Sequence, residues 1–225
     1  MPRTGRIAPG GIVYHVLNRG IGRRKLFNKD ADFEAYLELL AAATSRVPMR
    51  ILGFCLMSNH WHLVLWPHKN GDLSAFMRWL SNTHVRRHHQ HYQSYGEGHI
   101  YQGRFKHFPV QEDGHLLTLL RYVEANPLRA KLVSRAQDWR WSSLSCQRSP
   151  RTKIELLTDW PVDRPRRWTA LVNEPLEKGQ QEAVQTSLRR GRPLGGVAWS
   201  KATARKLGLG FTLNPRGRPL KVKQS

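Results

Sequence analysis

Two apolar runs joined by a very short connection constrain the fold of this chain most strongly. The runs cover residues 49–56 and 59–66, and only Met57 and Ser58 lie between them. A connection this short allows an antiparallel pair but not the crossover that parallel strands need. Pro67 follows the second run and closes it, because proline donates no ladder hydrogen bond. The centre of the chain therefore predicts a β-hairpin.

The elements on either side of this hairpin predict a fold class. Residues 12–17 predict a first strand, stopped at 18–20, and the helical spacing of residues 30–45 predicts a helix with Asp30 as its N-cap. A second helix (73–92), a fourth strand (105–110) and a third helix (114–126) are predicted after the hairpin. This order is the split β-α-β arrangement. We expect an α+β, ferredoxin-like fold, with a four-stranded antiparallel sheet, helices on one face and a further helix after the fourth strand.

His60 and His62 flank Trp61 inside the second strand of the hairpin. Side chains alternate between the two faces of a strand, so the two imidazoles share a face and Trp61 points the other way. Two imidazoles held together by a rigid element form half of a metal site. The alternative is that both histidines are half-buried and satisfy local hydrogen bonds. Further ligands would have to come from elsewhere in the chain.

Tyr122 and Asn126 lie four residues apart on the third helix and so share one of its faces. Pro127 disfavours helical conformation at Asn126, which places the pair in the last turn of the helix. There Asn126 could offer a hard amide oxygen beside the two imidazoles, and Tyr122 would be a candidate nucleophile one turn away. The alternative is that Tyr122 is an ordinary core aromatic residue and that Asn126 is a helix cap.

Charge is the dominant feature of the composition. The chain has 37 Lys and Arg against 16 Asp and Glu, which gives a formal net charge of +21 and a pI near 11. Such an excess favours a polyanionic partner, and nucleic acid above all. No apolar run approaches the length of a membrane span, and the N-terminal residues do not resemble a signal peptide. The two cysteines are too few for a disulfide framework and suit a reducing cytoplasm.

The composition and periodicity of the sequence change beyond about residue 145. We expect a folded domain over 8–145, an irregular linker or extension over 146–182, and a basic DNA-binding extension over 183–225. The last part contains ten Lys or Arg and no Asp or Glu, with a short helix expected at 199–207. Gly-Arg-Pro occurs twice in it, around Arg192 and Arg218, and is suited to reaching along a groove. A solvated basic tail is the alternative.

Five ordered motifs make this chain resemble the REP-associated tyrosine transposases, which are single-tyrosine HUH transposases of the IS200-like group. In order they are 14–20 (Tyr-His-Val-Leu-Asn-Arg-Gly), 57–63 (Met-Ser-Asn-His-Trp-His-Leu), 101–106 (Tyr-Gln-Gly-Arg-Phe-Lys), 121–130 (Arg-Tyr-Val-Glu-Ala-Asn-Pro-Leu-Arg-Ala) and 139–143 (Trp-Arg-Trp-Ser-Ser). Trp61 occupies the bulky hydrophobic position of the His-hydrophobic-His motif. The resemblance covers about residues 8–145.

The resemblance implies a metal-dependent enzyme that cleaves and rejoins single-stranded DNA. His60, His62 and Asn126 would bind a divalent metal, Mg²⁺ or Mn²⁺, which would polarise the scissile phosphate. Tyr122 would attack phosphorus and form a 5′-phosphotyrosine, leaving a free 3′-hydroxyl. Because the phosphodiester of a phenol preserves bond energy, rejoining would need no ATP. The sequence identifies no general base for Tyr122.

The expected partner is single-stranded DNA that carries a hairpin like those of repetitive extragenic palindromes, bound by a monomer or a homodimer. The candidate phosphate contacts are Arg19, Arg104, Lys106, Arg86, Arg87, Arg192 and Arg218. For Arg86 and Arg87 a solvated helix end is an equal alternative. Exposed bases could stack on Tyr95, Tyr101 or Trp141, although core packing explains each of these equally well.

Two other functions remain open from the sequence. A catalytically silent DNA-binding regulator could use the same scaffold, although the presence of all four candidate site residues argues against simple decay. A ferredoxin-like RNA-binding module is the third reading. It would need aromatic ribonucleoprotein motifs that are not evident, and it leaves His60 and His62 unexplained.

Overall fold

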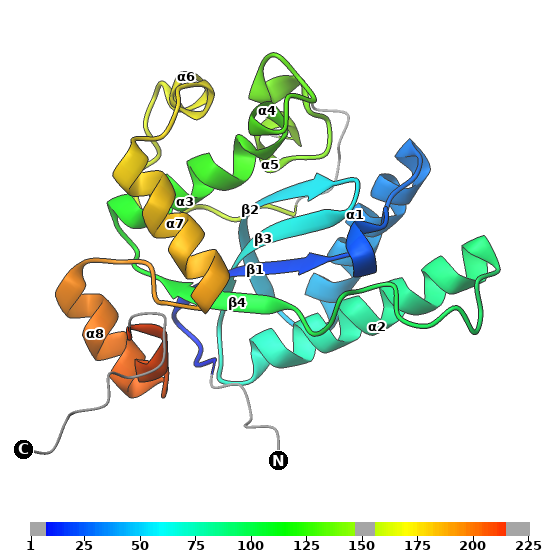
Figure 1. The fold of residues 1–225 in the computed structure, drawn as a ribbon, viewed down its shortest axis with the longest axis horizontal. Helices are drawn as coiled ribbons and strands as arrows, with labels where there is room; N and C mark the ends of the chain where they lie inside the picture. The colour runs from blue at the N-terminus through cyan, green and yellow to red at the C-terminus, as the bar shows by residue number, and fades with distance from the viewer. Residues whose placement is uncertain (1–7, 147–155, 215–225) are drawn as a thin grey trace, which may run out of the picture.

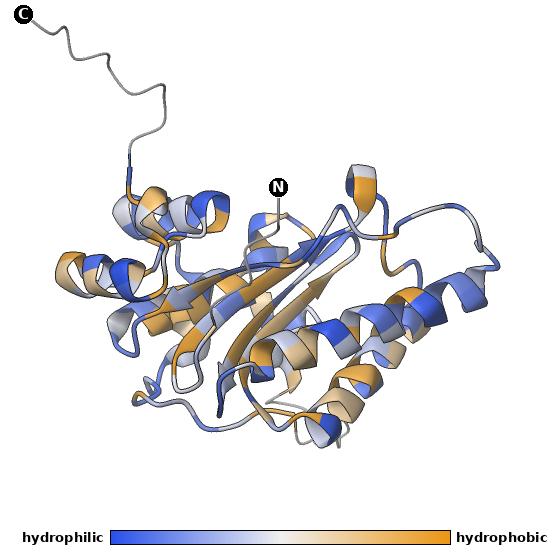
Figure 2. Cartoon of the chain, turned by 90° about the horizontal axis from the view of Figure 1, so that it is seen from below, coloured by the Kyte–Doolittle hydropathy of each residue, from blue (hydrophilic) through white to orange (hydrophobic). Residues whose placement is uncertain are grey.

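The computed structural model describes residues 8–146 and 156–214. Its centre is a four-stranded antiparallel sheet in the order β2-β3-β1-β4. The strands are β1 (Val13–Arg19), β2 (Met49–Met57), β3 (His60–Pro67) and β4 (Lys106–Val110). Figure 1 shows the sheet between two groups of helices, and Figure 2 shows its strands mainly in the orange of apolar residues. The predicted ferredoxin-like class is confirmed.

The predicted hairpin is formed by β2 and β3. Met57 pairs with His60 and Leu56 with Trp61, so the connection is as tight as the sequence requires. The register shifts between Ile51 and Gly53. A Cβ atom at Gly53 would lie 2.6 Å from the Leu120 side chain, so glycine lets a helix approach the sheet closely at this point.

Two helices, α1 (Asp30–Arg46) and α2 (Asp72–Tyr92), cover one face of the sheet. They bury the strand residues that point to their side, including Trp61. The predicted N-cap at Asp30 is wrong. Lys29 is the N-cap residue, and the Asp32 carboxylate accepts hydrogen bonds from the backbone N–H groups of Asn28 and Lys29. Asp32, two residues further on, is the carboxylate that reaches back to these free N–H groups.

The opposite face of the sheet is covered by α3 (Gly114–Glu124), whose Leu116, Leu119, Leu120 and Val123 enter a second apolar cluster with Val64 and Phe108. The helix ends at Glu124 instead of Asn126. Ala125 forms a joint, and a short helix, α4 (Asn126–Arg129), begins with Pro127 in its first turn. Proline has no N–H to lose there, so Pro127 starts a new helix where it could not continue the old one.

The remaining chain packs mainly on this second face. It forms the helices α5 (Ser143–Cys146), α6 (Trp168–Asn173), α7 (Lys178–Arg190) and α8 (Val197–Lys206), and the single turns η2 (Ala136–Asp138) and η3 (Gly210–Thr212). A further single turn, η1 (Ile21–Arg23), lies earlier in the chain, after β1. The expectation of an irregular segment over 146–182 does not hold for 156–182, which contains α6 and the start of α7. Trp168 and Val184 from these helices are buried against α3. The helix expected at 199–207 is present as α8.

No helix among the described residues is long and apolar enough to cross a membrane. Cys55 is buried and Cys146 is partly exposed, and neither is in a disulfide.

Candidate active site

His60 and His62 project from β3 toward α3, on the face opposite Trp61. Pairing with β1 sets His62 beside Leu17 and His60 beside Arg19. The two imidazole centroids are 5.1 Å apart. His62 is buried, with 3% of its surface exposed, whereas His60 is half-buried at the mouth of a cleft. The alternation of the strand therefore brings the two rings together as predicted.

The His62 ring is held from both sides. Its Nδ1 lies 2.9 Å from Nε2 of His15 in β1, and its Nε2 lies 2.8 Å from Nδ2 of Asn126. The Asn126 amide N–H donates to His62 Nε2, so the proton of the neutral His62 ring belongs on Nδ1, where His15 accepts it. The lone pair of His62 Nε2 then faces the cleft.

The His60 ring is also protonated on Nδ1, but a different residue fixes it. Asn59 donates from Nδ2 to the carbonyl of Arg23, which turns its Oδ1 toward His60 Nδ1 at 2.6 Å. Nδ1 of His60 therefore carries the proton, and Nε2 is left as the free acceptor.

Both imidazoles are kept neutral by their surroundings. Burial lowers the pKa of His60 to about 4, and the charges of Arg19 and Arg129 add to this effect. The pKa of His62 is held well below its ordinary value, first by burial and then by the neighbouring His15 and His60. A neutral ring is the form that binds a metal, so protons do not compete for this site near neutral pH.

Tyr122 reaches the same site from α3. Its ring lies edge-on to His62, with 6.4 Å between the centroids. The guanidinium of Arg129 sits 3.8 Å from the centre of the Tyr122 ring and donates to the Tyr122 carbonyl at 2.7 Å. A cation over the ring face, fixed by a backbone hydrogen bond, restricts the positions that Tyr122 can take.

The cleft around these groups has a volume of about 610 Å³ and a basic lining. Arg19, Arg104 and Lys106, three of the predicted phosphate contacts, line it, and Arg189 joins them from the end of α7. No Asp or Glu is among its described lining residues. The cleft can therefore attract a phosphodiester, and it contains no carboxylate that could serve as a base.

The other predicted DNA contacts lie elsewhere. Arg86 and Arg87 are on α2, which covers the other face of the sheet. Arg192 lies in the turn after α7, outside the cleft lining, and Arg218 is outside the described residues. Arg86, Arg87 and Arg192 sit away from the cleft because α2 and the turn after α7 place them there, and sequence spacing could not reveal that.

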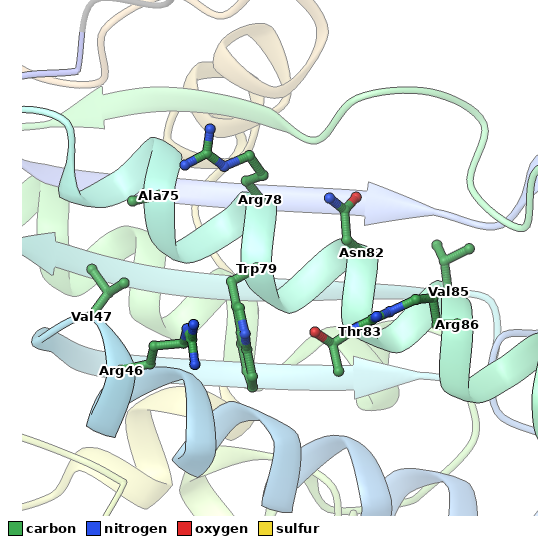
Figure 3. A pocket seen from close by; sticks show the side chains of 9 residues that line it. All are labelled: Arg46, Val47, Ala75, Arg78, Trp79, Asn82, Thr83, Val85 and Arg86. Atoms are coloured by element: carbon green, nitrogen blue, oxygen red, sulfur yellow. The ribbon is translucent and has the colours of Figure 1, made fainter.

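Arg86 borders a separate groove of about 650 Å³ between α1 and α2 (Figure 3). Its other lining residues include Arg46, Arg78 and Trp79, and the Arg46 guanidinium lies 5.9 Å from the centre of the Trp79 ring. The whole sheet separates this groove from His60 and His62.

The proposed base-stacking residues differ in their exposure. Tyr101 is buried and its hydroxyl accepts from Trp61 Nε1 at 3.0 Å and lies 2.7 Å from His84 Nδ1. Trp141 is buried in a stack with Phe33. Only Tyr95 is exposed, at 69%, so the structure assigns Tyr101 and Trp141 to the core.

Three side chains of the cleft could serve as ligands of a divalent metal ion. Among the described residues no group of three or more His, Cys, Asp or Glu side chains could hold a metal ion. The candidate ligands are instead two imidazole Nε2 atoms and the Asn126 amide, whose oxygen and nitrogen exchange places when the amide is turned over. Two imidazoles and one amide oxygen, with no cysteine among them, do not form the closed four-ligand set of a structural zinc site.

Sequence reasoning missed three residues of the site. His15 and Arg129 lie within the matched motifs, but no spacing rule pairs either of them with its partner. Arg189 comes from α7, a helix that the sequence did not predict. Their roles depend on strand register and on how the C-terminal helices pack.

The fold has counterparts among solved structures. A structure described as a REP-associated tyrosine transposase bound to a REP hairpin aligns with a TM-score of 0.51 and 17% identity, over 73% of this chain and 95% of that chain. A crystal structure of a putative transposase from Deinococcus radiodurans aligns with a TM-score of 0.39 and 16% identity, over 55% of this chain and 96% of the other. No curated protein sequence matches the chain.

The sequence profile of a family described as transposase IS200 like matches residues 10–126. This range is more than half of the 225 residues, and it contains the whole sheet, both histidines, Tyr122 and Asn126. The chain belongs to the IS200-like transposase family.

Proposed function

We propose that this chain cleaves and rejoins single-stranded DNA beside a hairpin, with Tyr122 as the nucleophile. The observation that carries the proposal is the meeting of three elements in one basic cleft: His60 and His62 from β3, Tyr122 from α3 and Asn126 from α4. The related transposase structure with a bound REP hairpin supports a hairpin substrate.

Each group has a distinct task in this proposal. The Tyr122 hydroxyl oxygen forms a bond to phosphorus as the bond from phosphorus to the 3′-oxygen breaks, which leaves a 5′-phosphotyrosine and a 3′-hydroxyl. Arg129 holds the ring of Tyr122 in place, and Arg19, Arg104 and Lys106 bind the neighbouring phosphates. Attack of a 3′-hydroxyl on the phosphotyrosine reverses the reaction.

His60 and His62, with the amide of Asn126, would hold a Mg²⁺ or Mn²⁺ ion. When bound, the ion supplies a positive charge that polarises the scissile phosphate. The chain prepares for it by keeping both imidazoles neutral with Nε2 toward the cleft. Asn59 and His15, which fix the two rings from behind, belong to this support.

The test is a covalent adduct between protein and DNA. We expect the protein, incubated with Mn²⁺ and labelled single-stranded DNA that carries a hairpin, to give a band that survives denaturation. EDTA should abolish the band, and Tyr122→Phe should lack it because it removes only the attacking oxygen. An undiminished band in Tyr122→Phe would overturn the nucleophile assignment. Hairpin binding with no adduct under any condition would favour the silent DNA-binding regulator.

A further inference from the structure

A second hollow, of about 450 Å³, opens from the candidate active site along β4. Leu17, Arg104, Lys106, Leu188 and Arg189 line both this hollow and the active-site cleft, so the two form one continuous groove. Its floor is formed by β1 and β4, and its far wall comes from the end of α7 and from η3. We call this second hollow the β4 groove.

The wall of the β4 groove is fixed in place. Gly191, with a φ of 70°, ends α7 and turns the chain back toward β4. Leu194 then donates to the Pro109 carbonyl and accepts from the Gln111 N–H, both at 2.9 Å. Gln111 also accepts from the Gly196 N–H through its side chain. The C-terminal helices are therefore tied to the edge of the sheet beside the groove.

The β4 groove is basic and its charges are available. Arg104, Lys106, Arg189 and Arg190 line it, and the lining contains no Asp or Glu. Among the described residues none of these four forms an ion pair. Arg190 donates to the Asn214 carbonyl, whereas Arg189 is exposed at the junction with the active site. A row of unpaired cations along a groove matches the charge of a phosphate backbone.

An exposed aromatic ring stands at the groove wall. Phe211 in η3 lines the β4 groove and leaves 68% of its surface exposed, so its ring is accessible from the groove. Bases of single-stranded DNA stack on such rings, and stacking works with any base because every base has a π-face. A double helix would offer no free base to Phe211.

We propose that the β4 groove binds the single strand that continues from the scissile phosphate, with Phe211 stacking on a base and Arg189 contacting a phosphate. This inference rests on the proposed function in one respect: that the strand leads into the active site. Both α7 and η3 lie beyond residue 126, outside the residues that the family profile matches. This strand-binding wall is thus a property of the C-terminal extension.

The experiment measures binding in EDTA, so that no cleavage occurs, by fluorescence anisotropy. The probes are a DNA hairpin without a flank and the same hairpin with a polythymidine flank on its 5′ or 3′ side. We expect one flank to tighten binding and Phe211→Ala to remove at least about fivefold of that gain. Phe211→Trp should keep the gain. Arg189→Gln should reduce the slope of log affinity against log salt by about 0.7, the value for one phosphate contact on a single strand.

Matched controls come from the same extension. Arg205→Gln removes an exposed charge from α8, and Val197→Ala removes a side chain that is 70% exposed. Both should bind the flanked probe as the wild type does. The proposal is overturned if neither flank tightens binding, or if Phe211→Ala weakens the flanked and unflanked hairpins equally. Absence of a Tyr122 adduct would defeat the proposed function alone, because the flank comparison decides the groove without it.

Discussion

His15 lies behind His62 and is almost completely buried. Its surface is 1% exposed, its ring stacks on Phe108 with 4.8 Å between centroids, and its Nε2 accepts from His62 Nδ1. Burial lowers the pKa of His15 to about 3, so this ring stays neutral and keeps its acceptor. His15 therefore selects the form of His62 in which Nε2 carries the lone pair that faces Asn126 and the cleft.

We predict that His15→Phe weakens Mn²⁺ binding about 10- to 100-fold, because the buried N–H of His62 loses its acceptor and the ring can turn. His15→Gln should restore most of the affinity, since its amide oxygen can accept the same hydrogen bond. Isothermal titration calorimetry with Mn²⁺ gives the affinities, and thermal unfolding shows whether each variant is folded. A folded His15→Phe variant with wild-type affinity for Mn²⁺ would rule out this positioning role.

At the residue scale, the sequence predicted what depends on local geometry. Strand alternation sets His60 and His62 on one face, and proline chemistry ends α3 close to Asn126, although Asn126 itself begins α4. The contact of His62 with His15 instead depends on the register between β3 and β1, which no local pattern encodes. Arg189 depends on the packing of α7, which sets the end of that helix beside β4.

At the element scale, α3 is braced by a buried carboxyl. Glu124 lies between Tyr122 and Asn126 and is completely buried. Its two oxygens accept from the Ser143 hydroxyl at 2.6 Å and from Trp168 Nε1 at 2.7 Å, so α5 and α6 are both tied to α3, the helix of Tyr122. Burial raises the pKa of Glu124, although both hydrogen bonds and the charge of Arg164 oppose this effect.

This raised pKa predicts a stability that depends on pH. The folded chain keeps the Glu124 proton to a higher pH than the unfolded chain, so the free energy of unfolding should fall as pH rises above the ordinary carboxyl range. Glu124→Gln cannot titrate and should remove that part of the fall, while its amide can still accept from Trp168 and donate to Ser143. Glu124→Ala should instead lose about 2–5 kcal/mol, from the cavity and the unpaired donors.

Urea unfolding at a series of pH values from about 4 to 8 measures the effect, with the wild type as reference. Equal pH dependence in the wild type and Glu124→Gln would show that the pKa of Glu124 is the same in the folded and the unfolded chain, and would contradict the raised pKa. The adduct assay on Glu124→Gln then shows whether the brace alone is enough to position Tyr122.

The elements that the sequence predicted well are those with a long periodic pattern. The strands and the first two helices agree with their predicted ranges to within about two residues. The end of α3 and the cap of α1 differ because single side chains decide them, namely Pro127 and Asp32. The helices within 156–190 were missed because residues 148–167, which are rich in Pro, Arg and Asp, indicated an irregular extension, and because α6 is only six residues long.

At the scale of the whole molecule, the positive charge is divided between the two faces of the sheet. One set of cations surrounds the candidate active site and the β4 groove, and another borders the groove between α1 and α2 in Figure 3. The proposed metal ligands, by contrast, are neutral. In the proposed function, DNA attraction and metal binding would thus rest on different side chains that meet in one cleft.

This separation leads to a prediction for His60→Ala. The pKa of His60 is lowered to about 4, so the ring carries no charge near neutral pH and contributes little to the attraction of phosphate. We expect the variant to lose adduct formation while its affinity for the hairpin stays within about threefold of the wild type, with the same salt slope. Arg104→Gln is the converse case: it should weaken binding and lower the salt slope. If a correctly folded His60→Ala protein also lost hairpin binding, the histidine would be part of the DNA-binding surface, and the division between cations that attract DNA and neutral groups that hold the metal would be wrong.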